Sequence, residues 1–267
     1  MSFLEDACAA ARERVAQARA EVPLTELRER AAARPAPLSL LEALTAPGLS
    51  VIAEVKRSSP SRGRMAEIPD PAGLAKAYEA GGAAAISVLT EPRWFDGSLA
   101  DLTTVAEAVS VPVLRKDFVV DAYQVWEARA AGAAAVLLIV AALSDAHLSG
   151  FLRTADDAGM DALVEVHDAD EAARAVKAWT YAGTGRHLIL GVNARDLTSL
   201  QVDPERFAAV RAALPDSAVA VAESGVRGPE SVRHLPGLGA QAVLVGEYVA
   251  THDDPEAAVR GLVEAGA

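Results

Sequence analysis

The sequence predicts an α/β protein, a (β/α)8 barrel with an N-terminal helical extension, from two observations. Short apolar runs alternate with amphipathic segments of about 11 to 16 residues, which is typical of βα units. The runs lack apolar–polar alternation, so both faces of each strand are expected to be covered, as in parallel sheets. Eight such runs are present: Val51–Lys56, Ala85–Leu89, Val113–Lys116, Ala135–Val140, Ala162–Val166, Leu188–Asn193, Ala218–Ala222 and Ala242–Val245.

Eight parallel strands in a chain of 267 residues favour a closed barrel over an open doubly wound sheet. No G-x-G-x-x-G turn follows the first strand, which argues against a dinucleotide site. Helix starts are expected from N-cap and proline signals at Asp70-Pro71, Ser98, Asp121, Ser144, Asp168, Asp203-Pro204, Gly228-Pro229 and Asp254-Pro255. Glycine is expected to end helices at Gly81-Gly82, Gly132, Gly159 and Gly239.

Residues 1–47 precede the first strand and are not needed to close a barrel. We therefore divide the chain into an N-terminal helical extension, 1–47, and a (β/α)8 TIM barrel domain, 48–267. The pattern predicts helices over Phe3–Val22 and Leu24–Ala33, with a further turn over Leu38–Leu44. A lid, a plug and a dimer element are all compatible with this extension.

Composition excludes several classes of partner and cofactor. A formal charge of −12 argues against a nucleic-acid or anionic-membrane surface. No apolar run reaches the roughly 20 residues of a membrane helix, and the N-terminus lacks a signal-peptide pattern. One cysteine, Cys8, excludes an internal disulfide, and the five histidines show no metal-ligand spacing. We expect a cytoplasmic protein without metal or cofactor, a monomer or a weak homodimer.

Charged and amide side chains occur where the predicted strands end. In a barrel these ends form one mouth, and side chains of alternate strands share a layer. Glu54, Lys116, Glu165 and Glu223 lie on the first, third, fifth and seventh strands, so they are expected to face one another. Lys56, Asn193 and Arg195 complete the set of strand-end residues.

Burying these charges costs several kcal/mol unless they pair, and a structural barrel would fill this layer with aliphatic side chains. One alternative is a structural ion-pair network. The other is an active site, because interleaved carboxylates and ammonium groups separate pKa values and let an acid and a base coexist. Six such residues together favour the active site.

Two glycine-bearing turns follow the seventh and eighth strands, Ser224-Gly225 and Gly246-Glu247. Barrel enzymes commonly bind a phosphate there through backbone N–H groups, so we expect a phosphorylated ligand. The basic, hydroxyl-rich loop 57–64 is long enough to cover an anion, although a solvated loop has the same composition. Trp94, Phe95 and Phe118 are candidates for an apolar wall, whereas a structural or capping role is favoured for His167.

These stretches together resemble the indole-3-glycerol phosphate synthase family across the whole chain. The resemblance is carried by Ile52–Ser61, Ile86–Glu91 with Phe95, Leu114–Phe118, Leu137–Val140, Leu163–His167, Gly191–Leu197, Ala222–Val226 and Val245-Gly246. It implies ring closure of 1-(2-carboxyphenylamino)-1-deoxyribulose 5-phosphate with loss of carbon dioxide and water, in tryptophan biosynthesis, without cofactor or metal.

The resemblance also implies roles for the residues. Lys116 is the expected general acid on the carbonyl oxygen, Lys56 and Glu165 form a second acid–base pair whose acid is left open, and Glu54, Asn193 and Glu223 assist them. The substrate carboxylate and ring would contact Ser59, Pro60, Phe95, Phe118, Leu137, Arg195, Leu197 and Leu244. The phosphate would contact Lys56, Ser224, Gly225, Gly246 and Glu247.

Two features of the sequence depart from the family pattern, and two rival functions stay open. Glu247 stands where many family members have serine, so its backbone N–H is expected to serve the phosphate while its side chain turns away. The long segment 177–187 is expected at the opposite face of the barrel from the chemistry. An aldolase-type barrel with a Schiff-base lysine and a catalytically inactive scaffold are the rivals.

Overall fold

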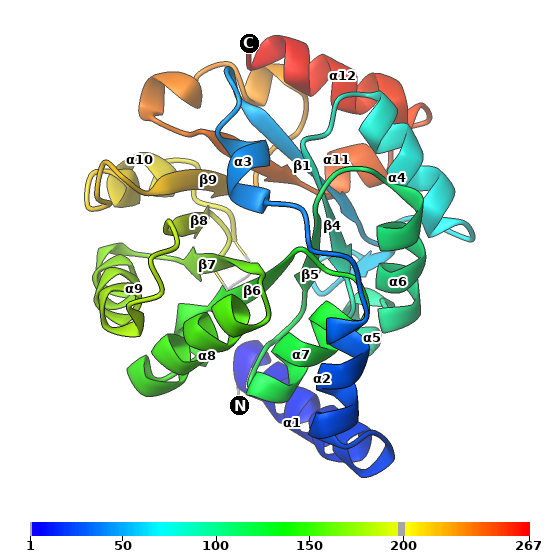
Figure 1. The fold of residues 1–267 in the computed structure, drawn as a ribbon. Helices are drawn as coiled ribbons and strands as arrows, with labels where there is room; N and C mark the ends of the chain where they lie inside the picture. Colours follow the sequence, from blue (N-terminus) through cyan, green and yellow to red (C-terminus); the bar gives the residue numbers. More distant parts are fainter. Residues whose placement is uncertain (1, 197–200) are drawn as a thin grey trace.

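The computed structural model describes residues 2–196 and 201–267 and contains a closed parallel barrel (Figure 1). Its order is β1-β10-β9-β8-β7-β6-β5-β4, and β1 pairs with both β10 and β4, so the predicted barrel is confirmed and the open sheet is excluded. Each predicted run forms a strand, with ends that differ by at most one residue. The strands are β1 Ser50–Val55, β4 Ala85–Leu89, β5 Val113–Lys116, β6 Ala135–Ile139, β7 Asp161–Val166, β8 Ile189–Asn193, β9 Val219–Glu223 and β10 Ala242–Val245.

Helices surround the strands, and most begin at the predicted caps. The side chains of Asp70, Ser98, Asp121, Ser144, Asp168 and Asp254 each accept a backbone N–H in the first turn of a helix. The helices outside the extension are α4 Pro71–Ala80, α5 Pro92–Phe95, α6 Leu99–Ala108, α7 Ala122–Ala130, α8 Asp145–Asp157, α9 Ala169–Ala182, α10 Arg206–Arg211, α11 Glu247–Ala250 and α12 Pro255–Ala265.

Two predicted helix starts are wrong. Helix α10 begins at Arg206, with Glu205 rather than Asp203 at its N-cap, and the Asp203 carboxylate instead accepts the N–H of Glu205. After Gly228 the chain forms only 3-10 turns, η2 Pro229–Ser231 and η3 Pro236–Leu238. Pro236 has no N–H to donate and Gly239 adopts a left-handed conformation, so a continuous α-helix does not form there.

The N-terminal extension contains three helices, α1 Phe3–Glu21, α2 Leu24–Ala32 and α3 Leu40–Leu44. Helices α1 and α2 lie outside the ring of strands beside α7, whereas α3 lies over its centre (Figure 1). Leu40 and Leu44 are fully buried and pack with the apolar side chains inside the barrel. Of the possible roles of the extension, α3 therefore acts as a plug; the division at residue 47 stays a prediction.

Side-chain parity places the functional layer above an apolar interior. Ile52 and Leu163 belong to the cluster inside the barrel, whereas Val55 and Val166 face the outer helices. Glu54 and Glu165 share the parity of the first two residues, so they project into the barrel near its C-terminal mouth. Within the described residues, no helix is long and apolar enough to cross a membrane.

Truncating the plug tests its contribution to stability. We expect Leu44→Ala to lower the free energy of unfolding by about 2–5 kcal/mol, because it opens a cavity among fully buried side chains. Urea unfolding measures this loss. The matched control is Leu38→Ala, whose side chain is 49% exposed and should cost at most about 0.5 kcal/mol. Equal losses of unfolding free energy in the two variants would contradict the role of α3 as a plug.

Candidate active site

The ammonium group of Lys116 lies between two buried carboxylates at the barrel mouth. Its Nζ is 3.1 Å from Oε2 of Glu223 and 3.4 Å from Oε2 of Glu54. The second lysine, Lys56, places its Nζ 3.0 Å from Oε1 of Glu54. Glu54 therefore bridges the two lysines, and the layer predicted from strand parity forms.

Glu165 occupies the same layer and is held from the neighbouring strand. Its Oε1 accepts a hydrogen bond from Asn193 Nδ2 at 3.1 Å. Asn193 is itself oriented, because its Oδ1 accepts the backbone N–H of Arg195 at 3.0 Å and the hydroxyl of Ser224 at 2.8 Å. The side chain of Asn193 is thereby fixed with its amide group toward the carboxylate.

The layer separates the pKa values of its members, as predicted. Burial alone would lower the pKa of Lys116, but the three carboxylates raise it above its usual range and keep the ammonium charged. Burial would raise the pKa of Glu165, yet the donors and cations around it lower the value to about 2. Burial and the two other carboxylates outweigh Lys116 at Glu223 and raise its pKa to about 7.

Two glycines make room for these charged groups. A Cβ on Gly191 would clash with Oε1 of Glu223, an oxygen that is buried and has no hydrogen-bond partner among the described residues. A Cβ on Gly246 would come within 2.8 Å of Lys56 Nζ and would also clash with Oε1 of Glu54. Neither backbone φ is in the left-handed region, so close approach rather than conformation requires glycine at both positions.

An apolar cavity opens on one side of Lys116. Six of the eight residues predicted to bind the substrate ring and carboxylate line it: Ser59, Pro60, Phe95, Phe118, Leu137 and Arg195. Leu244 lines the adjoining polar cavity instead, and Leu197 lies outside the described residues. Phe3 of α1 also lines the apolar cavity and packs edge-to-face on Phe118 at a centroid distance of 5.8 Å, a contact that no local sequence signal indicates.

The polar cavity on the other side of Lys116 contains the predicted phosphate residues. Lys56, Ser224, Gly225, Gly246 and Glu247 all line it, together with Arg62 and Arg227. Ser224 and Gly225 both adopt positive φ, which shapes the turn after β9. The side chain of Glu247 still borders the cavity, but its Oε1 pairs with Arg62 Nη2 at 2.9 Å, so an arginine offsets its charge.

Not every residue of loop 57–64 reaches the mouth. Arg57 turns outward and forms a two-pronged ion pair with Asp101, with contacts of 2.6 and 3.0 Å. Arg195 Nη1 lies 3.4 Å from the hydroxyl of Ser61, so the loop contacts the chain that follows β8. The segment 177–187 comprises the end of α9 and the chain that leads to the first residue of β8, so it lies at the end of the strands opposite the mouth, as predicted.

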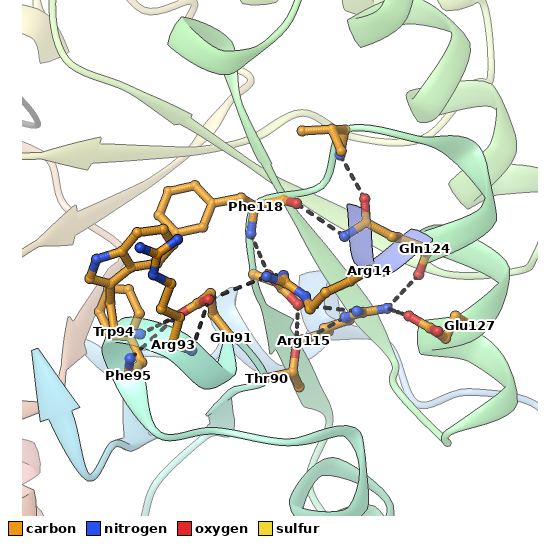
Figure 2. A network of polar contacts seen from close by, with 12 residues as sticks. Arg14, Thr90, Glu91, Arg93, Trp94, Phe95, Arg115, Phe118, Gln124 and Glu127 are labelled. Carbon is orange, nitrogen blue, oxygen red and sulfur yellow. Dashed lines mark hydrogen bonds and ion pairs between the residues drawn. The ribbon is translucent and has the colours of Figure 1, made fainter. Parts of the chain in front are cut away.

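A buried network holds the aromatic wall against the extension (Figure 2). Arg14 of α1 contacts Asp117 at 2.7 Å and Glu91 at 3.2 Å. Glu91 accepts the backbone N–H of Phe95, and Asp117 accepts that of Phe118. Phe95 and Phe118 are therefore positioned by carboxylates that depend on a residue from the extension.

Comparison with known proteins agrees with this geometry. The family model described as indole-3-glycerol phosphate synthase matches residues 4–262. A relative named indole-3-glycerol phosphate synthase from Beutenbergia cavernae is 53% identical, with 100% of this chain and 97% of that protein covered. One of the same name from Mycolicibacterium gilvum is 55% identical, with 94% of this chain and 90% of that protein covered.

Solved structures of lower identity share the fold alone. The 3-hexulose-6-phosphate synthase from Salmonella typhimurium superposes with a TM-score of 0.66 at 14% identity, covering 81% of this chain and 98% of that chain. A thiamine phosphate pyrophosphorylase from Pyrococcus furiosus gives a TM-score of 0.60 at 16% identity, covering 81% and 95%.

Removing Arg14 should weaken the fold more than removing another arginine of α1. We expect Arg14→Met to lower the free energy of unfolding by about 1–3 kcal/mol, because it deprives two almost fully buried carboxylates of a partner. The control is Arg19→Met, since Arg19 and Asp121 form an exposed pair worth at most about 1 kcal/mol. Urea unfolding compares them, and a larger loss for Arg19 would contradict this interpretation.

Proposed function

This chain belongs to the indole-3-glycerol phosphate synthase family, and we propose that it catalyses the reaction for which that family is named. The substrate is 1-(2-carboxyphenylamino)-1-deoxyribulose 5-phosphate, and the products are indole-3-glycerol phosphate, carbon dioxide and water. The observation that carries this proposal is the charged, partly buried Lys116, which lines both an apolar cavity and a polar cavity. The two cavities suit the aromatic and the phosphorylated ends of this substrate.

Ring closure needs an electrophilic carbonyl carbon beside the aromatic ring. The ring carbon that carries the carboxylate attacks the ketone, and Lys116 gives its proton to the carbonyl oxygen as the new carbon–carbon bond forms. The bond to the carboxylate then breaks, carbon dioxide leaves, and its electron pair restores the ring. Glu54 and Glu223 favour this step by keeping Lys116 charged and in place until the substrate arrives.

Dehydration then needs a second acid and a base. The hydroxyl leaves as water when an acid protonates it, and the ring CH2 carbon beside the nitrogen must give a proton to a base so that the double bond of the indole forms. The lowered pKa of Glu165 keeps its carboxylate ionised and able to accept a proton, so we assign the base to Glu165 and the acid to Lys56. Asn193 holds Glu165 in position for this transfer.

The remaining residues bind the substrate. Arg195 and Ser59 both line the apolar cavity and are suited to the substrate carboxylate. The ring lies against Pro60, Phe95, Phe118 and Leu137, with Leu244 near the ribulose chain. The phosphate is held by Lys56, Ser224, Gly225, Gly246 and the backbone N–H of Glu247. We place this enzyme in the cytoplasm as a monomer or weak homodimer.

Direct turnover tests the proposal. The purified, metal-stripped protein is incubated with the carboxyphenylamino-deoxyribulose phosphate while indole fluorescence and carbon dioxide release are followed. The appearance of both supports the synthase. Failure of both signals with a folded protein would reject this function.

Removing the proposed general acid should abolish most of the activity. We expect Lys116→Met to lower kcat/KM by about 10²–10⁴-fold, the range for loss of a positioned proton donor. The matched control is Lys76→Met, because Lys76 is exposed on α4 and should leave kcat/KM unchanged. Steady-state kinetics measure both variants. Near-normal turnover by the Lys116 variant would exclude this role.

A substitution at Gly191 tests whether the position of the Glu223 carboxylate matters for catalysis. Gly191→Ala should lower kcat at least about tenfold, because the added Cβ forces the Glu223 carboxylate away from Lys116 and misplaces the acid. Gly150→Ala is the control, since a Cβ on Gly150 of α8 meets nothing within 4 Å. Combining Gly191→Ala with Glu223→Gln should add little to either loss, and fully additive losses would argue against a shared cause.

A further inference from the structure

A histidine that lies outside both cavities contacts the proposed base. His167 follows β7, and its Nε2 is 3.3 Å from Oε1 of Glu165. This is an ion-pair distance, although Nε2 is buried and lacks a well-aligned hydrogen-bond partner among the described residues. His167 is not among the described residues that line the two cavities, so it does not reach the substrate directly.

The other side of the ring is anchored by helix α9. His167 Nδ1 lies 3.0 Å from Oε2 of Glu171, and the same oxygen accepts the backbone N–H of His167 at 2.8 Å. Glu171 is in the first turn of α9, where a carboxylate is also favoured by the helix dipole. The imidazole is thus fixed between a carboxylate of the barrel and a carboxylate of the surrounding helix.

We propose that His167, oriented by Glu171, is a positioning residue that holds Glu165 as an ionised base, and this rests on the function proposed above. Two carboxylates on opposite sides of one ring favour a doubly protonated imidazolium, which donates to both. The imidazolium then places a positive charge on the side of Glu165 away from the substrate. Asn193 donates a hydrogen bond to Glu165, and the charge of Lys116 also favours the ionised form of Glu165.

The charges facing this ring all act in the same direction. Burial would lower the pKa of His167, but Glu165 and Glu171 raise it to about 10, so the ring is charged at neutral pH. Burial would likewise raise the pKa of Glu165, and His167 and Lys116 oppose that effect. Removing the charge of His167 should therefore raise the pKa of Glu165, so that the base takes up a proton at a higher pH than in the wild type.

The test is the pH profile of kcat/KM for three variants, each expressed as its ratio to the wild-type value at the same pH. This ratio cancels ionisation of the substrate itself. For His167→Gln we expect a ratio that is constant toward pH 8 and falls as the pH is lowered, by up to about tenfold for each unit by which the pKa of Glu165 rises. Glu171→Gln should shift the profile in the same direction but less, because the ring keeps Glu165 as a partner.

The matched control is Asp170→Asn, which removes an exposed carboxylate from the same helical turn and should leave the ratio flat. A ratio that is equally low at every pH, or unchanged, for His167→Gln would overturn the proposal, because a structural role does not depend on the protonation of Glu165. A profile for Asp170→Asn that matches Glu171→Gln would also overturn it.

A second measurement separates this proposal from the function. The carboxyl carbon of Glu165 can be titrated by NMR in protein labelled with ¹³C-glutamate and identified by its absence in Glu165→Gln. We expect the midpoint to move to higher pH in His167→Gln even if the wild-type protein fails to turn over the substrate. An unchanged midpoint with an active wild type would reject the role of His167 while leaving the synthase intact.

Discussion

The burial of Lys116 among carboxylates is the constraint on which the rest of this barrel depends. An ammonium group in the interior costs several kcal/mol in lost hydration, and only close pairing offsets that cost. Glu54 and Glu223 supply the pairing from two other strands, so the register of the whole barrel must hold three side chains within hydrogen-bond distance. Gly191 and Gly246 follow from the same constraint, because a methyl group at either position would displace one of these charges.

The charged layer lies at the mouth of the barrel, and the rest of the barrel interior is packed with apolar side chains. The inner faces below the layer carry aliphatic side chains, and Leu40 and Leu44 of the extension close the bottom. The extension also reaches the opposite end of the barrel, where Phe3 lines the apolar cavity. There Arg14 forms ion pairs with the buried carboxylates beside that cavity (Figure 2). One segment ahead of the barrel thus contributes both to stability at the bottom and to the shape of the site at the mouth.

Strand parity explains how much of the site could be predicted from the sequence. Period-two alternation gives each strand-end residue a direction, and the alternate-strand rule then groups Glu54, Lys116, Glu165 and Glu223. Contacts of Phe3 and Arg14 could not be predicted, because they join residues far apart in the chain and depend on where α1 docks. The 3-10 turns after Gly228 were missed because a glycine–proline start resembles a helix start until Pro236 interrupts it. Likewise, His167 resembles a capping residue until the position of Glu165 is known.

The contrast between Glu165 and Glu223 argues against a purely structural ion-pair network. Both carboxylates are buried, and burial alone would raise both pKa values. The neighbouring groups therefore decide why the pKa of Glu165 is lowered while that of Glu223 is raised. Glu165 receives Asn193 and faces His167, whereas one oxygen of Glu223 has no hydrogen-bond partner among the described residues. A network selected only for stability would satisfy that oxygen, because an unsatisfied buried group costs about 1–3 kcal/mol. The arrangement instead leaves Glu165 ionised and Glu223 able to titrate near neutral pH in the same layer as Lys116, so groups that can accept and groups that can donate a proton lie close together.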